Sequence, residues 1–473
     1  MMWARRMVLP IALVTSALAF ASSAGAQLPA EFDTVVDEYV TEGLRSNLAL
    51  RSETLEVDKA AAALAAARAR FFPELSLQAR YSNSEGGREF TLPLGTALNP
   101  AYSTLNDLLQ AQGQATRFPL VTDQTIQFMR EQEQDTRFVV RQPLFAPTLS
   151  AAVRAQSALL DASSFRRMAI ARTLRRDITN AYIDFLKARS SVDIVAASEA
   201  LLIENLRVNQ SLFGNGKVTE DQVLRARAEL LEVEQQKREI ANLATQAQSF
   251  FNFLLNRNLL DEVVPSTPPD TAAQADTALE QLWAQALTRR PEVGQAQELT
   301  RASEHQVQIA QAQKWPTLSF GFDVGSQGEE YRFSDGYNFS TASLVFTWRL
   351  FDAGGDAARV RQTRASQRQL VLRQEEIAQQ IRLEVQQSFD RLQTARDSLA
   401  TAQARAEAAR AAFRIASRKR DEGVINQVEF IDARSTLTSA ELNYNLTRFN
   451  VLARRADLEY ATSSGELPLD PGA

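Results

Sequence analysis

Apolar and polar residues alternate over four short stretches, and this pattern predicts four amphipathic strands. The alternation is most regular in the third stretch, where Leu318, Phe320, Phe322 and Val324 fall on one face. A period of two with one apolar face is typical of a half-buried strand. The stretches form two predicted strand pairs, residues 74–82 with 136–145 and residues 317–325 with 341–351.

A very long stretch without proline or glycine follows each strand pair. The two stretches, 148–213 and 356–422, predict helices that are each about 100 Å long at 1.5 Å per residue. A helix of this length must pack along a partner. Apolar residues in the first one recur at spacings of four and three, as in a coiled-coil seam. They are Leu174, Ile178, Ala181, Phe185, Ala188, Val192 and Val195.

Shorter helices are predicted around these elements. One covers residues 31–72 and ends before Pro73, because proline cannot continue a helix. Two others, 219–256 and 425–462, each follow a glycine turn that ends a long helix.

Three landmarks recur in the same order and predict two copies of one helix–strand–strand–helix pattern. Phe72-Pro73 matches Trp315-Pro316, Leu144-Phe145 matches Leu350-Phe351, and Gly216 matches Gly423. Such self-similarity indicates an internal repeat. The copies are predicted to span residues 27–263 and 264–473. They differ most in the loop inside the strand pair, a polar loop of residues 83–135 in the first copy and 326–340 in the second.

Residues 1–26 have the pattern of a secretory signal peptide. Arg5 and Arg6 precede a short apolar run, and Ala24-Gly25-Ala26 provides a small-residue cleavage site. The run is shorter than the roughly 20 residues of a membrane-spanning helix, which argues against the alternative of a membrane anchor. No later segment of the chain approaches the roughly 20 consecutive apolar residues that a membrane-spanning helix needs. Contact with a membrane is therefore expected through amphipathic strands or a surface helix.

Composition excludes several kinds of chemistry. The chain has no cysteine and only one histidine, His305, which excludes disulfides, thiol chemistry and most transition-metal sites. Without the two signal arginines, the net charge changes from −5 to −7, which argues against nucleic acid as a partner. The segment Gly214-Asn215-Gly216-Lys217 lacks the spacing of a phosphate loop. We therefore expect no enzyme activity, no cofactor and no metal.

Four strands are too few to close a membrane barrel, since such barrels begin at about eight strands. An open sheet with an apolar outer face would leave backbone groups unpaired in lipid. The strands therefore predict either a barrel shared by several copies or a soluble α+β protein with long coiled-coil arms.

The set of elements, taken in order, resembles the TolC-like outer-membrane efflux proteins. The residues that carry the resemblance read FFPELSL, WPTLSFGFDVG, LFDAGGDAARVRQ and DEGVINQVEFIDARSTLTSAELNYN, and they come from both copies. The resemblance implies an α+β homotrimer whose copies each give four strands to one β-barrel in outer-membrane lipid. A long periplasmic α-helical coiled-coil barrel would continue it.

The function implied by this resemblance is a passive exit duct of a tripartite efflux or type I secretion system. Its expected partners are a periplasmic adaptor protein and an inner-membrane pump of RND, ABC or MFS type. The alternative function is a periplasmic coiled-coil structural or adaptor-like protein.

The resemblance also implies that acidic residues near the second copy's tip close the duct. The matching positions hold Glu429 and Asp432, which share a helix face because they lie three residues apart. Three copies would form carboxylate rings that favour cations. The alternative interpretation is two acids on a solvated helix face. The first copy has Gln222 and Arg225 there, and Arg225 is a possible gate partner for an acid of the neighbouring helix.

The two helix-to-helix turns match the family's docking surface for the adaptor. They contain Gly216, Val218 and Thr219 in the first copy and Gly423, Ile425 and Asn426 in the second. Helix capping also explains these residues, because glycine ends a helix and Thr or Asn begins the next one. Docking would additionally explain apolar residues at an exposed turn.

Overall fold

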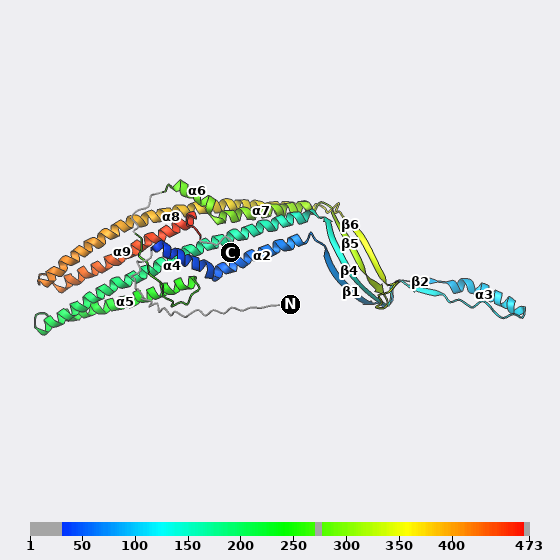
Figure 1. Cartoon of the computed structure of the whole chain (residues 1–473), viewed down its shortest axis with the longest axis horizontal. Helices are drawn as coiled ribbons and strands as arrows, with labels where there is room; N and C mark the ends of the chain where they lie inside the picture. The colour runs from blue at the N-terminus through cyan, green and yellow to red at the C-terminus, as the bar shows by residue number, and fades with distance from the viewer. Residues whose placement is uncertain (1–30, 270–276, 468–473) are drawn as a thin grey trace, which may run out of the picture. The chain divides into compact units, whose positions relative to one another are not determined.

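The computed structural model describes residues 31–269 and 277–467, so the predicted signal peptide lies outside the described residues. This part of the chain is mostly helical, with few strands (Figure 1). In chain order the elements are α1 (Phe32–Ser46), α2 (Leu48–Ala69), β1 (Glu74–Asn83), β2 (Glu89–Leu92), α3 (Leu94–Ala111), β3 (Gln124–Gln127), β4 (Gln132–Phe145), α4 (Pro147–Gly214), α5 (Glu220–Leu254), α6 (Leu279–Arg289), α7 (Pro291–Ala312), β5 (Thr317–Gly328), β6 (Asn338–Thr347), α8 (Gly355–Asp421) and α9 (Gln427–Thr462).

The chain forms two compact units, and each unit takes segments from both sequence copies. The first unit contains the described residues of 1–42, 178–275 and 403–449. The second contains those of 43–177, 276–402 and 450–473. Helices α1, α4, α8 and α9 contribute to both units. A repeat of the sequence is therefore not a compact unit of the fold.

A four-stranded antiparallel sheet belongs to the second unit, with the strand order β1-β4-β5-β6 (Figure 1). Because β4 pairs with β5, the strand pairs of the two copies join into one sheet. The register aligns mostly apolar residues in rows across the four strands. One row contains Leu75, Val140, Phe322 and Ala342, and the next contains Leu77, Phe138, Val324 and Ser340.

The opposite face of this sheet carries polar and charged residues. Arg137 lies 2.7 Å from the carboxylate of Asp135 and 4.0 Å from that of Asp323 on the neighbouring strand. Arg80 of β1 lies 3.7 Å from Asp135. The sheet is therefore amphipathic across its full width. Among the described residues, its edge strands β1 and β6 each pair on one side only.

An aromatic cluster forms a core in the first unit. The ring of Tyr182 on α4 is fully buried and lies 5.5 Å from Tyr39 of α1 and 5.6 Å from Phe251 of α5. Its hydroxyl lies 2.9 Å from the carbonyl oxygen of Val264 and 2.9 Å from Oγ of Ser266. The segment that joins the two sequence copies is thereby fastened to α4.

The predicted seam of α4 is packed along its length. Leu174, Ile178, Ala181, Phe185 and Val195 are buried, while Ala188 and Val192 are half-buried. In the first unit, Val195 and the nearby Leu202 contact Leu230 and Val233 of α5. The heptad spacing thus reflects helix-to-helix packing.

The segment 31–72, which the sequence predicts as one helix, is two helices. Helix α1 ends at Ser46, and α2 begins at Leu48. The side-chain oxygen of Asn47 accepts hydrogen bonds from the backbone N–H groups of Ala49 and Leu50, at 3.0 and 3.2 Å. This is an N-cap, and the extended backbone of an N-cap residue interrupts the preceding helix.

The predicted polar loop 83–135 contains further elements. Strands β2 and β3 form a two-stranded sheet, and α3 lies between them in the sequence. Pro100 lies inside α3, and a proline in the middle of a stretch normally argues against a helix. The prediction of a plain loop was therefore wrong.

Strand β6 ends at Thr347 and not at the predicted residue 351. The residues after Thr347 form the turn that leads into α8. The indole N–H of Trp348 donates to the carbonyl of Lys314 at 3.1 Å. The carboxylate of Asp352 accepts hydrogen bonds from the N–H groups of Gly354 and Asp356. Ala353 adopts a φ of +53°, which no strand residue has.

Candidate functional site

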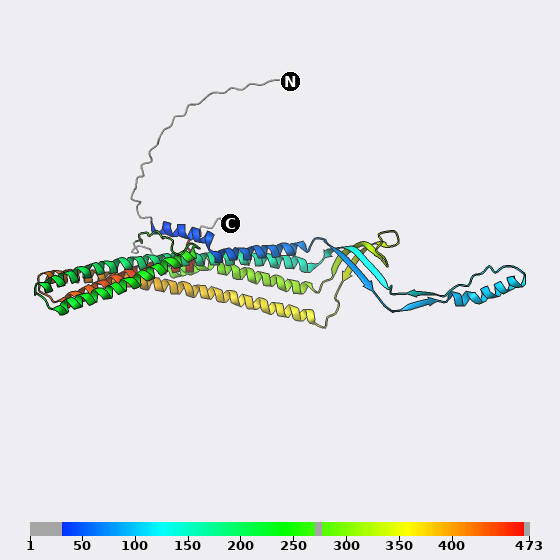
Figure 2. The same cartoon turned by 90° about the horizontal axis from the view of Figure 1, so that it is seen from below.

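The turns from α4 to α5 and from α8 to α9 lie in the first unit (Figure 2), and their glycines have similar backbone conformations. Gly216 has φ +67° and Gly423 has φ +73°. The residue after each glycine donates its N–H to a carbonyl five residues earlier, Lys217 to Leu212 at 2.9 Å and Val424 to Lys419 at 2.8 Å. This is a Schellman motif, in which glycine supplies the left-handed conformation. Both glycines therefore have a capping role.

The helices that follow the turns begin differently. The N–H of Glu429 donates to Oδ1 of Asn426 at 2.9 Å, and Nδ2 of Asn426 lies 3.2 Å from a carboxylate oxygen of Glu429. This reciprocal pairing ties the N-cap residue of α9 to the third residue of the helix, as in a capping box. At the start of α5, the hydroxyl of Thr219 instead bonds to the carboxylate of Asp221.

Glu429 and Asp432 are both exposed in the first turns of α9. Two carboxylates near the N-terminus of a helix also interact favourably with its dipole. Glu429 thus has a local structural partner in Asn426, whereas its predicted role at an aperture concerns the assembled protein and stays a prediction.

The apolar residues exposed at the turns differ from those that the sequence emphasised. Val218 and Ile425 are half-buried. The apolar side chains that face solvent here include Phe213, Val424 and Val428, which are 45%, 67% and 56% exposed. A docking surface on these turns would therefore be formed by these three residues more than by Val218 and Ile425.

Arg225 pairs within its own helix in this structure. Its Nε lies 3.8 Å from the carboxylate of Asp221, one turn earlier on α5, and both side chains are exposed. The expected pairing with an acid of a neighbouring helix is not made within the single chain.

A buried arginine near the turns, which the sequence did not single out, joins the two hairpins of the first unit. Arg434 of α9 is 4% exposed. Its Nη1 donates to Oγ of Ser198 on α4 and its Nη2 to the carboxylate of Glu229 on α5, each at 2.8 Å. Burial lowers the pKa of Arg434, and Glu229 offsets part of this effect. Nε is buried without a hydrogen-bond partner.

A second arginine makes a similar connection closer to the turn. Arg420 of α8 donates from Nη1 to Oδ1 of Asn205 on α4 at 3.2 Å. Its guanidinium carbon lies 3.9 Å from the ring centre of Phe430, which is a cation–π contact. The α8–α9 hairpin is therefore fastened to α4 and α5 through two arginines.

The internal repeat carried a signal for Arg434. The spacing that aligns Gly216 with Gly423 also aligns Arg227 with Arg434, so an arginine stands at this position in both copies. In the structure Arg227 is exposed, whereas Arg434 is buried. The sequence showed the recurrence, but only the packing distinguishes the two arginines.

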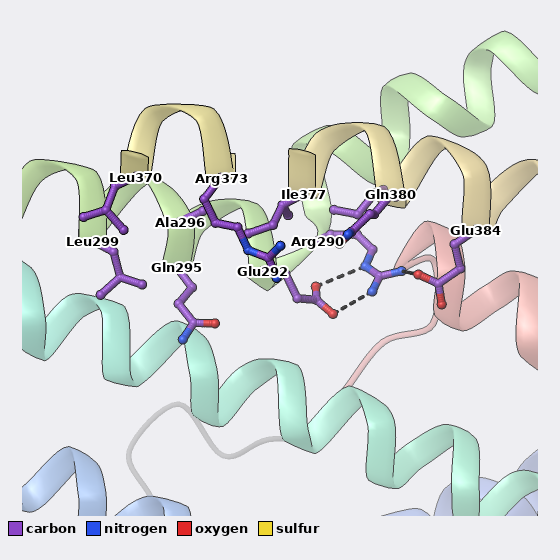
Figure 3. Close-up of a pocket in the computed structure, with 11 residues that line it drawn as sticks. Arg290, Glu292, Gln295, Ala296, Leu299, Leu370, Arg373, Ile377, Gln380 and Glu384 are labelled. Atoms are coloured by element: carbon purple, nitrogen blue, oxygen red, sulfur yellow. Dashed lines mark hydrogen bonds and ion pairs between the residues drawn. The ribbon is translucent and has the colours of Figure 1, made fainter. Parts of the chain in front are cut away.

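The second unit has a pocket of about 360 Å³ between α7 and α8 (Figure 3). Apolar residues such as Leu299, Leu370 and Ile377 line one part of it. Arg290, Glu292 and Glu384 line another. Figure 3 shows Arg290 between the two carboxylates, with hydrogen bonds of 2.6 Å to each.

The charges of this pocket are largely satisfied by one another. Burial works against the charged form of Arg290, but the hydrogen bond to Glu292 and the charges of Glu292 and Glu384 together outweigh burial and raise the pKa of Arg290. Burial likewise works against the charged form of Glu292, but the hydrogen bond to Arg290 and the positive charges of Arg290 and Arg172 together lower the pKa of Glu292. Arg373 pairs with Glu376 at 2.5 Å. These ion pairs indicate a junction between helices more than a site for a charged ligand.

In the described ranges, 31–269 and 277–467, no helix has an apolar stretch that could cross a membrane. No group of three or more acidic or histidine residues in these ranges is arranged to hold a metal ion.

Residues 282–464 match the family model described as outer membrane efflux protein. This range contains the strands β5 and β6, the long helix α8 and both acids of the predicted aperture. No curated protein matches the chain.

Solved structures of outer-membrane channels share the fold. The outer-membrane channel OprN has a TM-score of 0.73 and 20% identity, over 92% of each chain. The CmeC outer membrane channel of Campylobacter jejuni has a TM-score of 0.74 and 16% identity, over 98% of this chain and 96% of that one. The open state of the MtrE outer membrane channel of Neisseria gonorrhoeae has a TM-score of 0.71 and 16% identity, over 91% and 89%.

The resemblance predicted from the sequence is confirmed by the match of the family model. Residues 282–464 thus resemble the outer membrane efflux protein family, and the chain has the fold of outer-membrane channels over about nine-tenths of its length.

Proposed function

We propose that three copies of the chain form an outer-membrane exit duct for a tripartite efflux or type I secretion system. In this proposal the sheets of the second unit form one barrel in the outer membrane. The long helices form a coiled-coil tube in the periplasm. A periplasmic adaptor and an inner-membrane pump of RND, ABC or MFS type supply the opening force and the energy, and the duct itself catalyses no reaction.

The observation that carries this proposal is an amphipathic sheet with two unpaired edges. One apolar row extends across all four strands and the next across β1, β4 and β5, and large side chains such as Leu75, Leu77 and Phe346 are more than 60% exposed. In lipid such a face is stable only if every strand edge is paired. Pairing β1 of one copy with β6 of the next satisfies both edges, and three copies give twelve strands, within the range of known membrane barrels.

The polar face of the sheet fits the interior of such a barrel. Arg137, Asp135 and Asp323 form a charged network on this face. Membrane barrels have a polar interior and an apolar exterior. The charged rows would therefore line the water-filled passage.

Fractionation tests the duct against a periplasmic coiled-coil structural or adaptor-like protein. We expect the full chain in the outer-membrane fraction as a trimer, with its mass in detergent measured by light scattering. A soluble periplasmic monomer would exclude the duct and favour the alternative.

We further propose that Glu429 and Asp432 line the periplasmic aperture of the trimer. Both are exposed near a turn of the first unit, and three copies would bring six carboxylates near one axis. Such rings attract cations and repel anions. The related MtrE channel has been solved in an open state, and we infer that an adaptor widens the aperture of this chain as well.

Replacing both acids tests the aperture. Glu429→Ala with Asp432→Ala should raise the conductance of the duct in planar bilayers and lower its preference for cations, because the carboxylate rings are removed. The matched control is Glu220→Ala with Asp221→Ala, which removes the same charge from the first turn of α5. If conductance and selectivity do not change, or change equally in the control, Glu429 and Asp432 do not line the aperture.

A further inference from the structure

The segment 84–131, called here the outer arm, is a folded element that is held together by asparagine side chains. Two asparagines of α3, one at 99 and one at 106, bind the extended chain that returns beside the helix. Asn99 exchanges two hydrogen bonds of 2.8 Å with the backbone of Val121. Asn106 accepts from the N–H of Phe118 at 3.1 Å and donates to its carbonyl at 2.7 Å. Both views show this chain alongside α3 (Figures 1 and 2).

Further contacts fix the start and middle of the arm. Asp123 accepts hydrogen bonds from the backbone N–H and the hydroxyl of Thr96, each at 2.9 Å. The rings of Tyr102 and Phe118 lie 5.5 Å apart. The half-buried face of α3 therefore packs against the returning chain of the arm. These contacts fix the orientation of the helix relative to that chain.

A second face of α3 carries an exposed apolar stripe with coiled-coil spacing. Its residues follow one another at intervals of four, three, four and three; they are Leu94, Leu98, Ala101, Leu105 and Leu108. The four leucines are between 38% and 56% exposed. This spacing keeps side chains on one side of a helix that packs along another helix. Within the arm α3 is the one helix, so its stripe has no helical partner there.

The charges of α3 favour a second copy over a membrane surface as the partner. Asp107 is the one charged residue among the eighteen of α3, and the helix has no lysine or arginine. Helices that lie on membranes typically carry basic residues on their polar face. The polar face of α3 is instead occupied by Asn99 and Asn106. An uncharged leucine stripe is complementary to an identical stripe.

We propose that the outer arms of three copies associate through these stripes and form a three-helix bundle at the outer end of the barrel. This inference rests on the proposed trimer. Each arm connects the edge strand β1 to β4, at the ends of the strands away from α2 and α4. Three arms would therefore leave the shared barrel at the same rim.

The dimensions permit the bundle. Twelve strands spaced about 4.8 Å apart and tilted by about 40° give a barrel about 24 Å across. Three helices with axes about 9 Å apart, each about 10 Å wide, form a bundle about 20 Å across. The arms can therefore meet above the barrel without moving far sideways, and their bundle would narrow the exit.

Cysteine crosslinking tests this contact directly, because the chain has no cysteine of its own. In the full chain, Leu105→Cys places a thiol on the stripe, and mild oxidation of the detergent-purified protein should give a covalent dimer on denaturing gels. Ala101→Cys, a small change on the same stripe, repeats the test if the leucine variant does not fold. Ser103→Cys is the control, since Ser103 is exposed on the opposite side of α3.

The mass of the same samples in detergent separates the inference from the proposed function. A trimer that crosslinks at the stripe and not at position 103 supports the bundle. A trimer that does not crosslink at the stripe, or that crosslinks equally at position 103, overturns the bundle and leaves the duct in place. Shielding of the stripe thiol from a water-soluble maleimide only when lipid is present would assign the arm to the membrane and also overturn it. The absence of a trimer would overturn both.

Discussion

Arg434 differs from Arg227 only in what surrounds it, although the two arginines occupy the same position of the repeat. Arg434 reaches Ser198 and Glu229 across the junction of two hairpins, while Arg227 is exposed. Removing one partner of a buried, hydrogen-bonded charge leaves the other polar groups without partners, which costs more than the loss of an exposed pair. The junction should therefore depend on Arg434 and much less on Arg227.

The variant Arg434→Ala tests this difference between the arginines. We expect a loss of about 2 kcal/mol in stability, because Ser198 and Glu229 lose a buried donor, and a higher conductance in planar bilayers because the α8–α9 hairpin is released. Thermal unfolding and single-channel recording measure the two effects. Arg227→Ala is the matched control and should change stability by less. Equal effects in both variants would show that the buried contacts of Arg434 do not hold the junction.

At the scale of elements, the sequence best predicts helix ends that are marked by glycine and strands that are marked by alternating apolar and polar residues. Glycines at 216 and 423 end the long helices near the expected residues, since the left-handed conformation favours glycine. The outer arm was not predicted, because Pro100 interrupts the helical pattern and the asparagine fastening joins residues that are distant in the sequence. The break between α1 and α2 rests on one N-cap residue, Asn47, which no short sequence pattern singles out.

One ion-paired arginine contacts α7, α8 and α9 in the second unit. Arg290 bonds to Glu292 of α7 and Glu384 of α8 and lies 4.9 Å from the ring centre of Tyr460 on α9. A carboxyl whose pKa is lowered by folding stabilises the fold above its unfolded pKa, and this contribution is lost as the pH falls through the folded pKa. Glu292 is such a group, with an ordinary pKa of 4.5.

The variant Glu292→Gln should therefore unfold at a lower temperature than the original chain at pH 7. The difference should shrink as the pH falls below about 4.5, where protonation removes the same charge in the original chain. Thermal unfolding followed by circular dichroism over this pH range measures it. Glu376→Gln is the control, since Glu376 forms an exposed pair with Arg373. A difference that is independent of pH would contradict the role of the Glu292 charge.

At the scale of the whole molecule, alternation in the sequence predicts the strands but not the order in which they pair. The order β1-β4-β5-β6 places the two copies in one sheet, and this joining depends on long-range contacts such as that between Val140 and Phe322. The acids at 429 and 432 were found through the resemblance, and the role proposed for them would depend on neighbours from other copies of the chain. Contacts such as those of Arg434 required the packed structure.

The two arginine contacts of the first unit also determine how stiffness would be distributed in a trimer. Arg434 and Arg420 join the hairpins within each chain, whereas the matching Arg227 is left at the surface. Six hairpins would then move as three stiff pairs, and most of the compliance would lie at the three junctions between chains. An adaptor that separates the chains at those junctions could dilate the tube without breaking the contacts inside any chain.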